Sequence, residues 1–380
     1  MSKYCPRIHH GLMLSNVTQN SFSYSACCWS KNNINTSSTV DFFHPSLVEL
    51  RTTNQQQKLP ESECSKCIHQ ENTNKKSMRQ GYLETHGPET FDASIQYLDI
   101  NIDYTCNLAC VTCGPGLSTT WRKELGIKGQ HVRPNLDKFF LEKLDSLDLS
   151  KLQEVRMWGG EPFLTLTHKK ILEYIKSRTD PSQIKLMYNT NGTQRIDQAT
   201  NHLIEQFKFA RISFSIDGIG DQFEYLRYPA KWPQVEETLM WWRENLPHNS
   251  MLSLTVTASI LNVIDIGQVY DWCKLHFSKS IFGDDIEIYV HQAFGEYGLE
   301  TMPESMITHF KSITDYCQPW IQQLNMLGQN KHNLKLVVKQ LEKNDQRRGI
   351  NLIDVYPAVA EFINYQHKAI SKPLADNFGC

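Results

Sequence analysis

Six short apolar runs, separated by segments with helical periodicity, restrict the fold of this chain more than any other feature of its sequence. The runs occupy 97–102, 154–158, 184–189, 211–216, 252–259 and 286–291. The main helical segments between them are 167–178, 197–208, 233–245 and 263–277. Strands that alternate with helices usually join in parallel through helical crossovers. The strongly apolar runs are typical of strands covered on both faces. The pattern therefore predicts an α/β fold with a parallel sheet.

The sequence on either side of this region has a different texture. Residues 1–92 are polar and poor in periodic segments, with a strand pair expected around 7–29 and a helix near 45–56. So few apolar residues predict a small loop-rich unit that a bound metal would stabilise. From 301 onward the periodicity is helical, at 304–327, 334–344 and 358–370. We therefore expect three parts, 1–92, 93–300 and 301–380.

Composition narrows the class of protein. The 380 residues are 40% hydrophobic and 21% charged, with a formal net charge of −2, which is typical of a soluble globular protein. Such a balance predicts no nucleic-acid partner and no membrane surface. No run approaches the roughly 20 apolar residues that span a bilayer, and the first residues do not resemble a secretory signal. We expect a cytoplasmic protein, in which clustered cysteines are metal ligands rather than disulfides.

Three cysteines follow the first apolar run at close spacing. Cys106, Cys110 and Cys113 form a C-x3-C-x2-C motif. In parallel βα folds, functional groups gather on loops at the carboxyl ends of strands. Three thiolates can hold three irons of a cubane cluster and leave the fourth iron open. A zinc site is the alternative, although structural zinc usually takes four protein ligands.

The second apolar run ends in Trp158-Gly159-Gly160-Glu161-Pro162. Because Gly159 and Gly160 have no Cβ, a ligand can approach their backbone closely. The Glu161 carboxylate and nearby carbonyls can accept hydrogen bonds from an ammonium group. By itself this segment could also be a simple strand-to-helix turn. Its position one βα unit after the cysteine loop favours a binding role.

Together, the two motifs resemble those of the radical S-adenosylmethionine (SAM) superfamily over residues 97–291. The resemblance implies a partial (β/α)6 TIM-type barrel, a [4Fe–4S] cluster on the three cysteines, and SAM bound to the open iron. It also implies reductive cleavage of SAM to a 5′-deoxyadenosyl radical, which abstracts hydrogen from a substrate. An external electron donor such as flavodoxin or ferredoxin is implied as a partner.

Further segments are similar to those of the superfamily. The run 188–192 resembles its third-strand segment and makes Asn189 a candidate cofactor-binding residue. Ser215 and Asp217 lie in a segment similar to the fourth-strand segment, whose Ser and Asp reach the bound SAM. In related enzymes, an Arg at the spacing of Arg227 holds the SAM carboxylate, as paired guanidinium hydrogen bonds allow. A surface salt bridge is the alternative for Arg227. No residue is identified as catalytic.

A second group of cysteines precedes the barrel. Cys5, Cys27, Cys64 and Cys67, with the order hairpin, helix and C-x2-C, resemble the twitch module, a short SPASM-type domain with an auxiliary [4Fe–4S] cluster. The usual twitch follows the barrel, so the order is swapped in this chain. Cys27 is preferred to Cys28 because of its place after the expected strand.

The chemistry of this second group keeps alternatives open. Four cysteines could also hold a structural zinc ion. A cluster fully ligated by cysteine has no open iron and would act in electron transfer. If Cys5 or Cys27 is not a ligand, the cluster could instead bind substrate.

The sequence favours a radical SAM enzyme that modifies or oxidises a peptide. One alternative is a related enzyme, such as a dehydrogenase, that acts on a small metabolite such as a sugar or nucleoside. The other is a catalytically silent iron–sulfur or zinc scaffold, which the intact set of motifs argues against.

Overall fold

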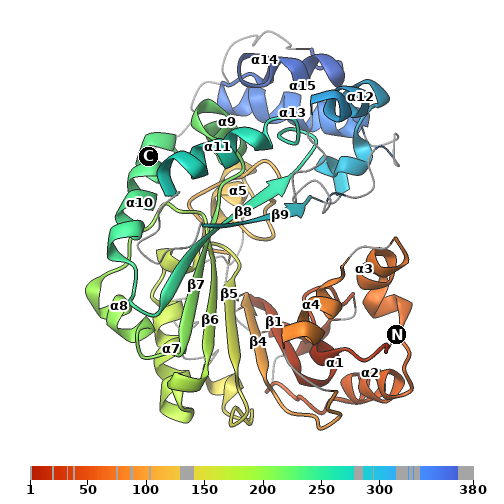
Figure 1. Ribbon diagram of the computed structural model, residues 1–380, viewed down its shortest axis with the longest axis vertical. Coiled ribbons are helices and arrows are strands. Elements are labelled where there is room, and N and C mark those ends of the chain that lie inside the picture. The colour runs from red at the N-terminus through yellow and green to blue at the C-terminus, as the bar shows by residue number, and fades with distance from the viewer. Residues whose placement is uncertain are drawn as a thin grey trace. The chain divides into compact units, whose positions relative to one another are not determined.

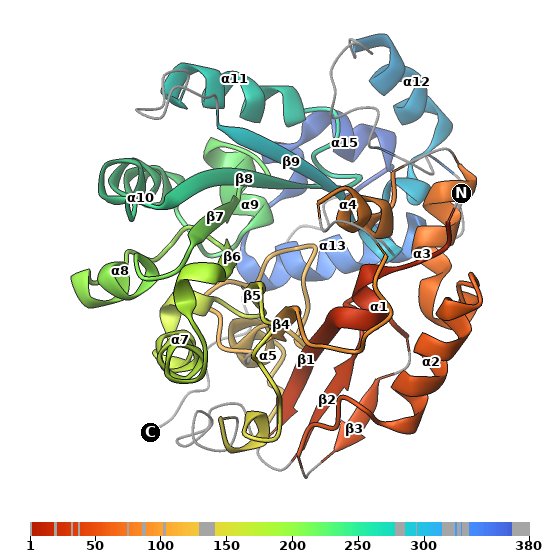
Figure 2. The same ribbon diagram turned by 60° about the horizontal axis from the view of Figure 1, so that its bottom comes forward.

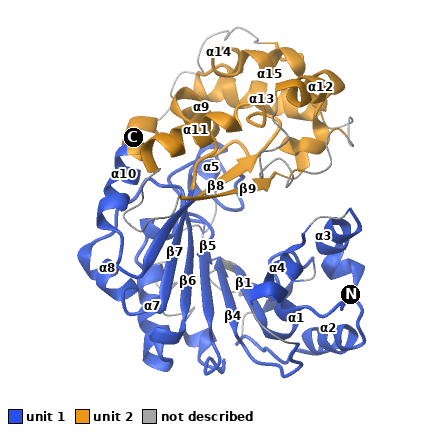
Figure 3. Cartoon of the chain, viewed as in Figure 1, with its two compact units in different colours: residues 1–109, 113–214, 237–253 blue, residues 110–112, 215–236, 254–380 orange. Residues whose placement is uncertain are grey.

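The structure, a computed structural model, falls into two compact units (Figure 3). Unit 1 comprises residues 1–109, 113–214 and 237–253, and unit 2 comprises 110–112, 215–236 and 254–380. The described residues are 2–18, 21–31, 33–36, 39–73, 76–85, 89–101, 104–128, 141–277, 286–293, 295–313, 324, 328 and 334–366. The units do not test the expected three-part division, which stays a prediction.

The described strands form one sheet in the order β3-β2-β1-β4-β5-β6-β7-β8-β9. Their bounds are β1 Gly11–Thr18, β2 Ser21–Ser25, β3 Ile34–Thr36, β4 Tyr97–Asn101, β5 Glu154–Trp158, β6 Lys185–Thr190, β7 Phe209–Ser215, β8 Ser250–Ala258 and β9 Glu287–Gln292. Each of the six expected strands is present, and β5 has the bounds that the sequence predicts. Strand β8 begins in unit 1 and ends in unit 2.

The helices of the βα units follow the expected pattern closely, whereas the N-terminal part, expected to be loop-rich with one helix near 45–56, has four helices among its described residues. Those before β4 are α1 Pro6–His10, α2 Pro45–Gln55, α3 Glu61–Asn72 and α4 Met78–Thr85. Those that follow are α5 Thr119–Glu124, α7 Thr167–Arg178, α8 Gln198–Ile204, α9 Gly220–Leu226, α10 Trp232–Asn245 and α11 Ile266–Phe277, with short 3-10 turns at Pro162–Leu164 and Pro181–Gln183. The prediction of α7 is confirmed at both ends.

Strands β4 to β7 of unit 1 run parallel and bury a continuous apolar row. Leu98 pairs with Val155, Val155 with Leu186, and Leu186 with Ala210. All four side chains are fully buried. Helices α7 and α8 lie beside β6 and β7 (Figure 1). The prediction of a parallel sheet of βα units is therefore confirmed.

The N-terminal strands extend this sheet. Strands β1 and β2 form the expected antiparallel pair, and β3 continues it. Strand β1 also pairs in parallel with β4, so that Leu12 faces Leu98 in the register (Figure 2). Periodicity within one segment does not reveal such pairing between segments, and the sequence did not predict it.

The end of the chain in unit 2 is helical, as expected. It holds 3-10 turns at Gly295–Tyr297 and Leu299–Thr301, then α12 Glu304–Ile313, α13 Leu334–Arg348, α14 Leu352–Val355 and α15 Pro357–Phe362. The buried Asp345 carboxylate accepts hydrogen bonds from the hydroxyls of Tyr225 and Tyr365 and from the Leu352 N–H. Most of the expected helix 304–327 beyond residue 313, and Cys317 and Cys380, lie outside the described residues. Among the described helices, none is both long and apolar enough to cross a membrane.

Candidate active site and metal centre

The loop that carries the C-x3-C-x2-C motif joins β4 to α5 and is fixed by hydrogen bonds at its far end. Ser118 caps α5 by accepting from the Trp121 N–H, and its hydroxyl donates to the Leu108 carbonyl. The Thr119 hydroxyl accepts from the Cys106 N–H and donates to the Cys106 carbonyl. The helix cap and the first cysteine therefore hold each other in place.

The turn after β5 packs against this loop within unit 1. The Glu161 N–H donates to the Thr105 carbonyl at 2.7 Å. A Cβ on Gly160 would lie 2.1 Å from the same carbonyl oxygen, so only glycine allows this approach. The sequence predicted that a ligand approaches the backbone at Gly160. In the structure, the backbone of the cysteine loop occupies this position. Gly159 has a φ of 123°, which also favours glycine.

The buried Glu161 carboxylate links the turn to the end of β6. It accepts hydrogen bonds from the Phe163 N–H, the Thr190 hydroxyl and the Asn191 N–H, at 3.1, 2.8 and 2.6 Å. Asn191 in turn donates from Nδ2 to Asn107, and it lies 3.8 Å from the Cys106 sulfur. The predicted residue Asn189 is instead exposed on β6.

The rest of the predicted site belongs to unit 2. Arg227 forms an ion pair with Asp217 at 2.8 Å, and both side chains are buried. The other Asp217 oxygen accepts from the Thr257 N–H, and Arg227 Nη1 lies 4.0 Å from the Cys110 sulfur. The backbone at Val111 is joined to Leu226 by a hydrogen bond. Arg227 is therefore not a surface salt bridge. Ser215 ends β7 and is half-buried.

These surroundings are compatible with thiolate ligands of a cluster. Burial raises the pKa of the Cys106 thiol to about 11. A metal ligand must be deprotonated, so binding has to compensate for this cost. The Asn191 amide beside Cys106 and the Arg227 guanidinium beside Cys110 are hydrogen-bond donors and favour sulfur that carries negative charge.

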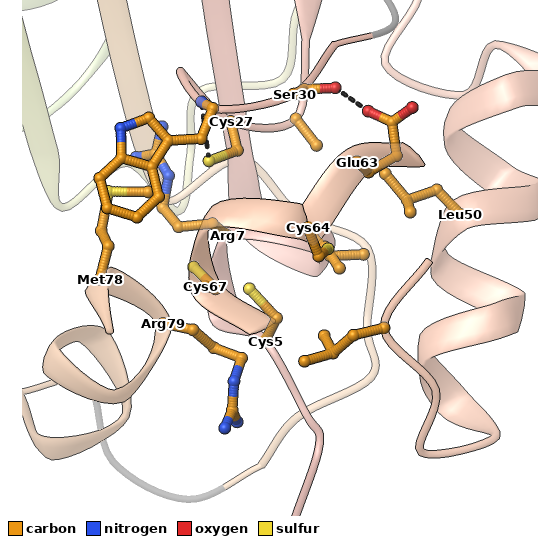
Figure 4. Close-up of a pocket in the computed structure, with 14 residues that line it drawn as sticks. Cys5, Arg7, Cys27, Ser30, Leu50, Glu63, Cys64, Cys67, Met78 and Arg79 are labelled. Carbon is orange, nitrogen blue, oxygen red and sulfur yellow. Dashed lines mark hydrogen bonds between the residues drawn. The ribbon is translucent and has the colours of Figure 1, made fainter. Parts of the chain in front are cut away.

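The four N-terminal cysteines predicted as ligands line one pocket in unit 1 (Figure 4). Cys5 precedes α1, Cys27 follows β2, and Cys64 and Cys67 lie on α3. All four line the pocket, together with Arg7 and Arg79. Burial raises the pKa of Cys5 to about 11 and that of Cys64 to about 12. This arrangement brings four thiols from three segments of the chain to one pocket.

Cys28 differs from Cys27 in its surroundings. Its sulfur lies 3.9 Å from the Met78 sulfur, and it is not among the residues that line the pocket. Its pKa is raised, first by a hydrogen bond to Cys27 and then by burial. Cys27 accepts a hydrogen bond from the Trp29 N–H at 3.4 Å. The contacts therefore favour Cys27 over Cys28 as the ligand.

Within the described part of the chain, no three His, Cys, Asp or Glu side chains are placed to share one metal ion. In a cubane cluster, each cysteine binds a different iron atom, so its ligands need not converge on one point.

Comparisons with known proteins agree with the motifs. The chain is 24% identical over 235 residues to GTP 3',8-cyclase of Desulforamulus reducens, covering 61% of this chain and 60% of that protein. It is 29% identical over 192 residues to GTP 3',8-cyclase of Alkaliphilus metalliredigens, covering 47% of this chain and 50% of the relative. These similarities support the resemblance of the motifs to those of the radical SAM superfamily. The chain spans less than two thirds of the length of these relatives.

No protein-family model matches this chain. Among solved structures, SuiB of Streptococcus suis bound to S-adenosylmethionine is 14% identical, with a TM-score of 0.38, over 82% of this chain and 63% of that one. Native anSMEcpe with bound AdoMet is 17% identical, with a TM-score of 0.38, over 54% and 55% of the two chains. Similarities this loose do not establish a shared fold.

The structure also brings to the two sites residues that the sequence did not predict. Asn191 contacts the cysteine loop, whereas Asn189 was predicted. The available signal was position, because Asn191 is the first residue after β6, where loop residues of βα folds carry function. Arg7, which lines the N-terminal pocket, had no signal in a short polar segment.

Proposed function

We propose that this chain binds SAM beside a [4Fe–4S] cluster on Cys106, Cys110 and Cys113 and uses it to abstract hydrogen from a substrate. When bound, the cluster and SAM supply the 5′-deoxyadenosyl radical. The observation that carries the proposal is the contact of the Gly160–Glu161 turn with the cysteine loop at Thr105. It joins the two most specific motifs of the sequence in one unit.

The roles of the surrounding side chains follow from their chemistry. Glu161 and the carbonyls of its turn accept hydrogen bonds from the SAM ammonium group, with Gly159 and Gly160 shaping the turn. Arg227, oriented by Asp217, donates to the SAM carboxylate.

Ser215 and Asn189 are proposed contacts at the ends of their strands. An external carrier such as flavodoxin or ferredoxin supplies the electron. The proposed organisation remains that of a twitch-like segment, 1–92, a barrel, 93–300, and a helical extension, 301–380.

Formation of 5′-deoxyadenosine tests this activity. The full chain is reconstituted without oxygen with iron and sulfide, then mixed with SAM and dithionite. The proposal expects 5′-deoxyadenosine and methionine in equal amounts from the wild type. No product above a Cys106→Ala control would support the silent scaffold instead.

We further propose an auxiliary [4Fe–4S] cluster on Cys5, Cys27, Cys64 and Cys67, acting in electron transfer. Its support is the common pocket with sulfur donors and few other ligands. Metal analysis tests it. Two clusters predict about eight irons per chain and no zinc, whereas one zinc with about four irons would contradict the second cluster.

For the substrate, we propose a peptide, in keeping with the twitch-like arrangement of the N-terminal cysteines. A purine nucleotide is a second candidate, because the curated relatives are named GTP 3',8-cyclase. Adding GTP to the SAM cleavage assay separates the two. Faster formation of 5′-deoxyadenosine with a new nucleotide product supports the second candidate. An unchanged rate with GTP and acceleration by a peptide encoded beside the gene supports the first.

A further inference from the structure

Arg7 lies almost fully buried in the wall of the pocket that holds the four N-terminal cysteines. It belongs to α1, two residues after Cys5, and its side chain is 1% exposed. Nη2 donates to Asp99 on β4 at 2.5 Å, and the Asp99 side chain is equally buried. This ion pair holds one edge of the guanidinium, and its Cζ also lies 5.3 Å from the centre of the Tyr82 ring.

Two nitrogens of this guanidinium lack a hydrogen-bond partner among the described residues, namely Nε and Nη1. A buried donor without a partner destabilises the fold, and more so when it is charged. Such atoms in a native structure call for a ligand that accepts from them. The lining of the pocket includes Arg7, and Figure 4 shows its side chain extending toward Cys27 and Met78.

Charge also points to an anionic group at this place. The Arg7 guanidinium stays protonated, and Cys27 lies with it in the lining of the pocket. Gly11 leaves room for the Arg7 side chain because it has no Cβ. A Cβ at this position would lie only 3.0 Å from Arg7 Nε. The wall of the pocket therefore contains a permanently charged guanidinium with two nitrogens that can donate to a ligand.

The other arginines of this region do not share these properties. Arg79 also lines the pocket, but its guanidinium donates to both Glu71 oxygens and to the carbonyls of Ser2 and Tyr4. Arg51 is also buried, and its Nη2 lacks a partner among the described residues, but it does not line the pocket. Its Nε and Nη1 donate to backbone carbonyls. Arg7 thus combines a place at the pocket with unused donors.

We propose that Arg7 is a positioning residue of the auxiliary cluster, donating N–H···S hydrogen bonds to its sulfurs and raising its reduction potential. This role of Arg7 rests on the proposed auxiliary cluster and adds a residue that sets the reduction potential of that cluster. Hydrogen bonds to sulfur and local charge set the potentials of iron–sulfur clusters. Reduction adds one electron and no proton, since the guanidinium stays protonated, and the added negative charge is stabilised by Arg7.

The first test measures the midpoint potential of the auxiliary cluster by a dithionite titration followed by electron paramagnetic resonance (EPR). The parent is the full chain with Cys106, Cys110 and Cys113 changed to Ala, so that only the auxiliary cluster remains. Arg7→Lys keeps the charge and the partner Asp99 but loses the planar donors. We expect its equilibrium constant for reduction to fall about tenfold, a shift of about 59 mV to more negative potential. Arg51→Lys, the matched buried control, should leave the potential unchanged.

A second measurement needs no substitution at Arg7. The parent is grown with arginine labelled with ¹⁵N in the guanidinium, and pulsed EPR of the reduced cluster is recorded. A ¹⁵N coupling that persists in Arg79→Lys, which removes the other arginine of the pocket lining, supports the proposal. A coupling that is lost in Arg79→Lys, or that is absent from the parent, overturns it. It decides the question if Arg7→Lys fails to fold.

The outcomes separate the two proposals. A parent that binds zinc or no iron contradicts the auxiliary cluster itself, and with it the role of Arg7. A parent with about four irons whose potential is the same in Arg7→Lys overturns only the role of Arg7.

Discussion

At Gly160, a single hydrogen in place of a Cβ sets how closely the turn after β5 approaches the cysteine loop. The Thr105 carbonyl oxygen would meet a Cβ at 2.1 Å, and carbonyl and turn are both backbone that cannot swing aside. The turn also carries Glu161, whose carboxylate reaches β6. The geometry of the cysteine loop therefore depends on this residue having no side chain.

Substitution of Gly160 by Ala is expected to displace the cysteine loop and to lower the rate of 5′-deoxyadenosine formation about a hundredfold, as small misplacements at reacting centres do. Gly116 is the matched control, since it lies just after the same motif and a Cβ there meets nothing within 4 Å. Equal rates for Gly160→Ala and Gly116→Ala would contradict the account.

Substitution of the adjacent residues Cys27 and Cys28 tests which of the two binds the auxiliary cluster. The iron content of Cys27→Ala should fall by about four atoms per chain, because it removes a pocket ligand. Cys28→Ala should keep its iron, since Cys28 contacts Met78 instead. The reverse result would exchange the roles of the two residues.

Between elements, buried polar contacts hold the βα units in register. His168 at the start of α7 packs on Tyr188 of β6, with its Nδ1 3.3 Å from the tyrosine hydroxyl and its ring edge-on to Phe163. The His168 side chain is 3% exposed, and burial lowers its pKa to about 4. The helix therefore packs on the strand with a neutral histidine.

This contact predicts a loss of stability in acid. The folded pKa of His168 is below the unfolded value of about 6.5, so the unfolded chain takes up the proton first. Protonation of His168 therefore does not change the free energy of unfolding above about pH 6.5. As the pH falls from there toward about 4, protonation of the unfolded chain lowers this free energy.

In urea titrations, the difference in free energy of unfolding between wild type and His168→Gln should shrink by about 2 kcal/mol from pH 7 to pH 5. A constant difference would contradict a buried neutral histidine.

The sequence predicted elements better than the contacts between them. Strand β5 and helix α7 have their predicted bounds because apolar periodicity is a local property. The parallel pairing of β1 with β4 joins residues far apart in the chain, and no local pattern encodes it. The same holds in the site, where Asn191 and Arg7 gain their importance from neighbours distant in sequence.

In the proposed function, the two groups of cysteines of this chain hold two clusters with different chemistry. Cys106, Cys110 and Cys113 give three ligands, which leaves one iron open to SAM. The N-terminal pocket offers four, which leaves none open. Binding of SAM should therefore change the electronic structure of one cluster and not of the other.

EPR of two reduced variants, each recorded with and without SAM, tests this claim most directly. One variant has Cys106, Cys110 and Cys113 changed to Ala, and the other has Cys5, Cys27, Cys64 and Cys67 changed to Ala. Each should hold about four irons, and SAM should alter the spectrum only when the first three cysteines are intact. A spectrum that responds to SAM without those three cysteines, or fails to respond with them, would contradict the account.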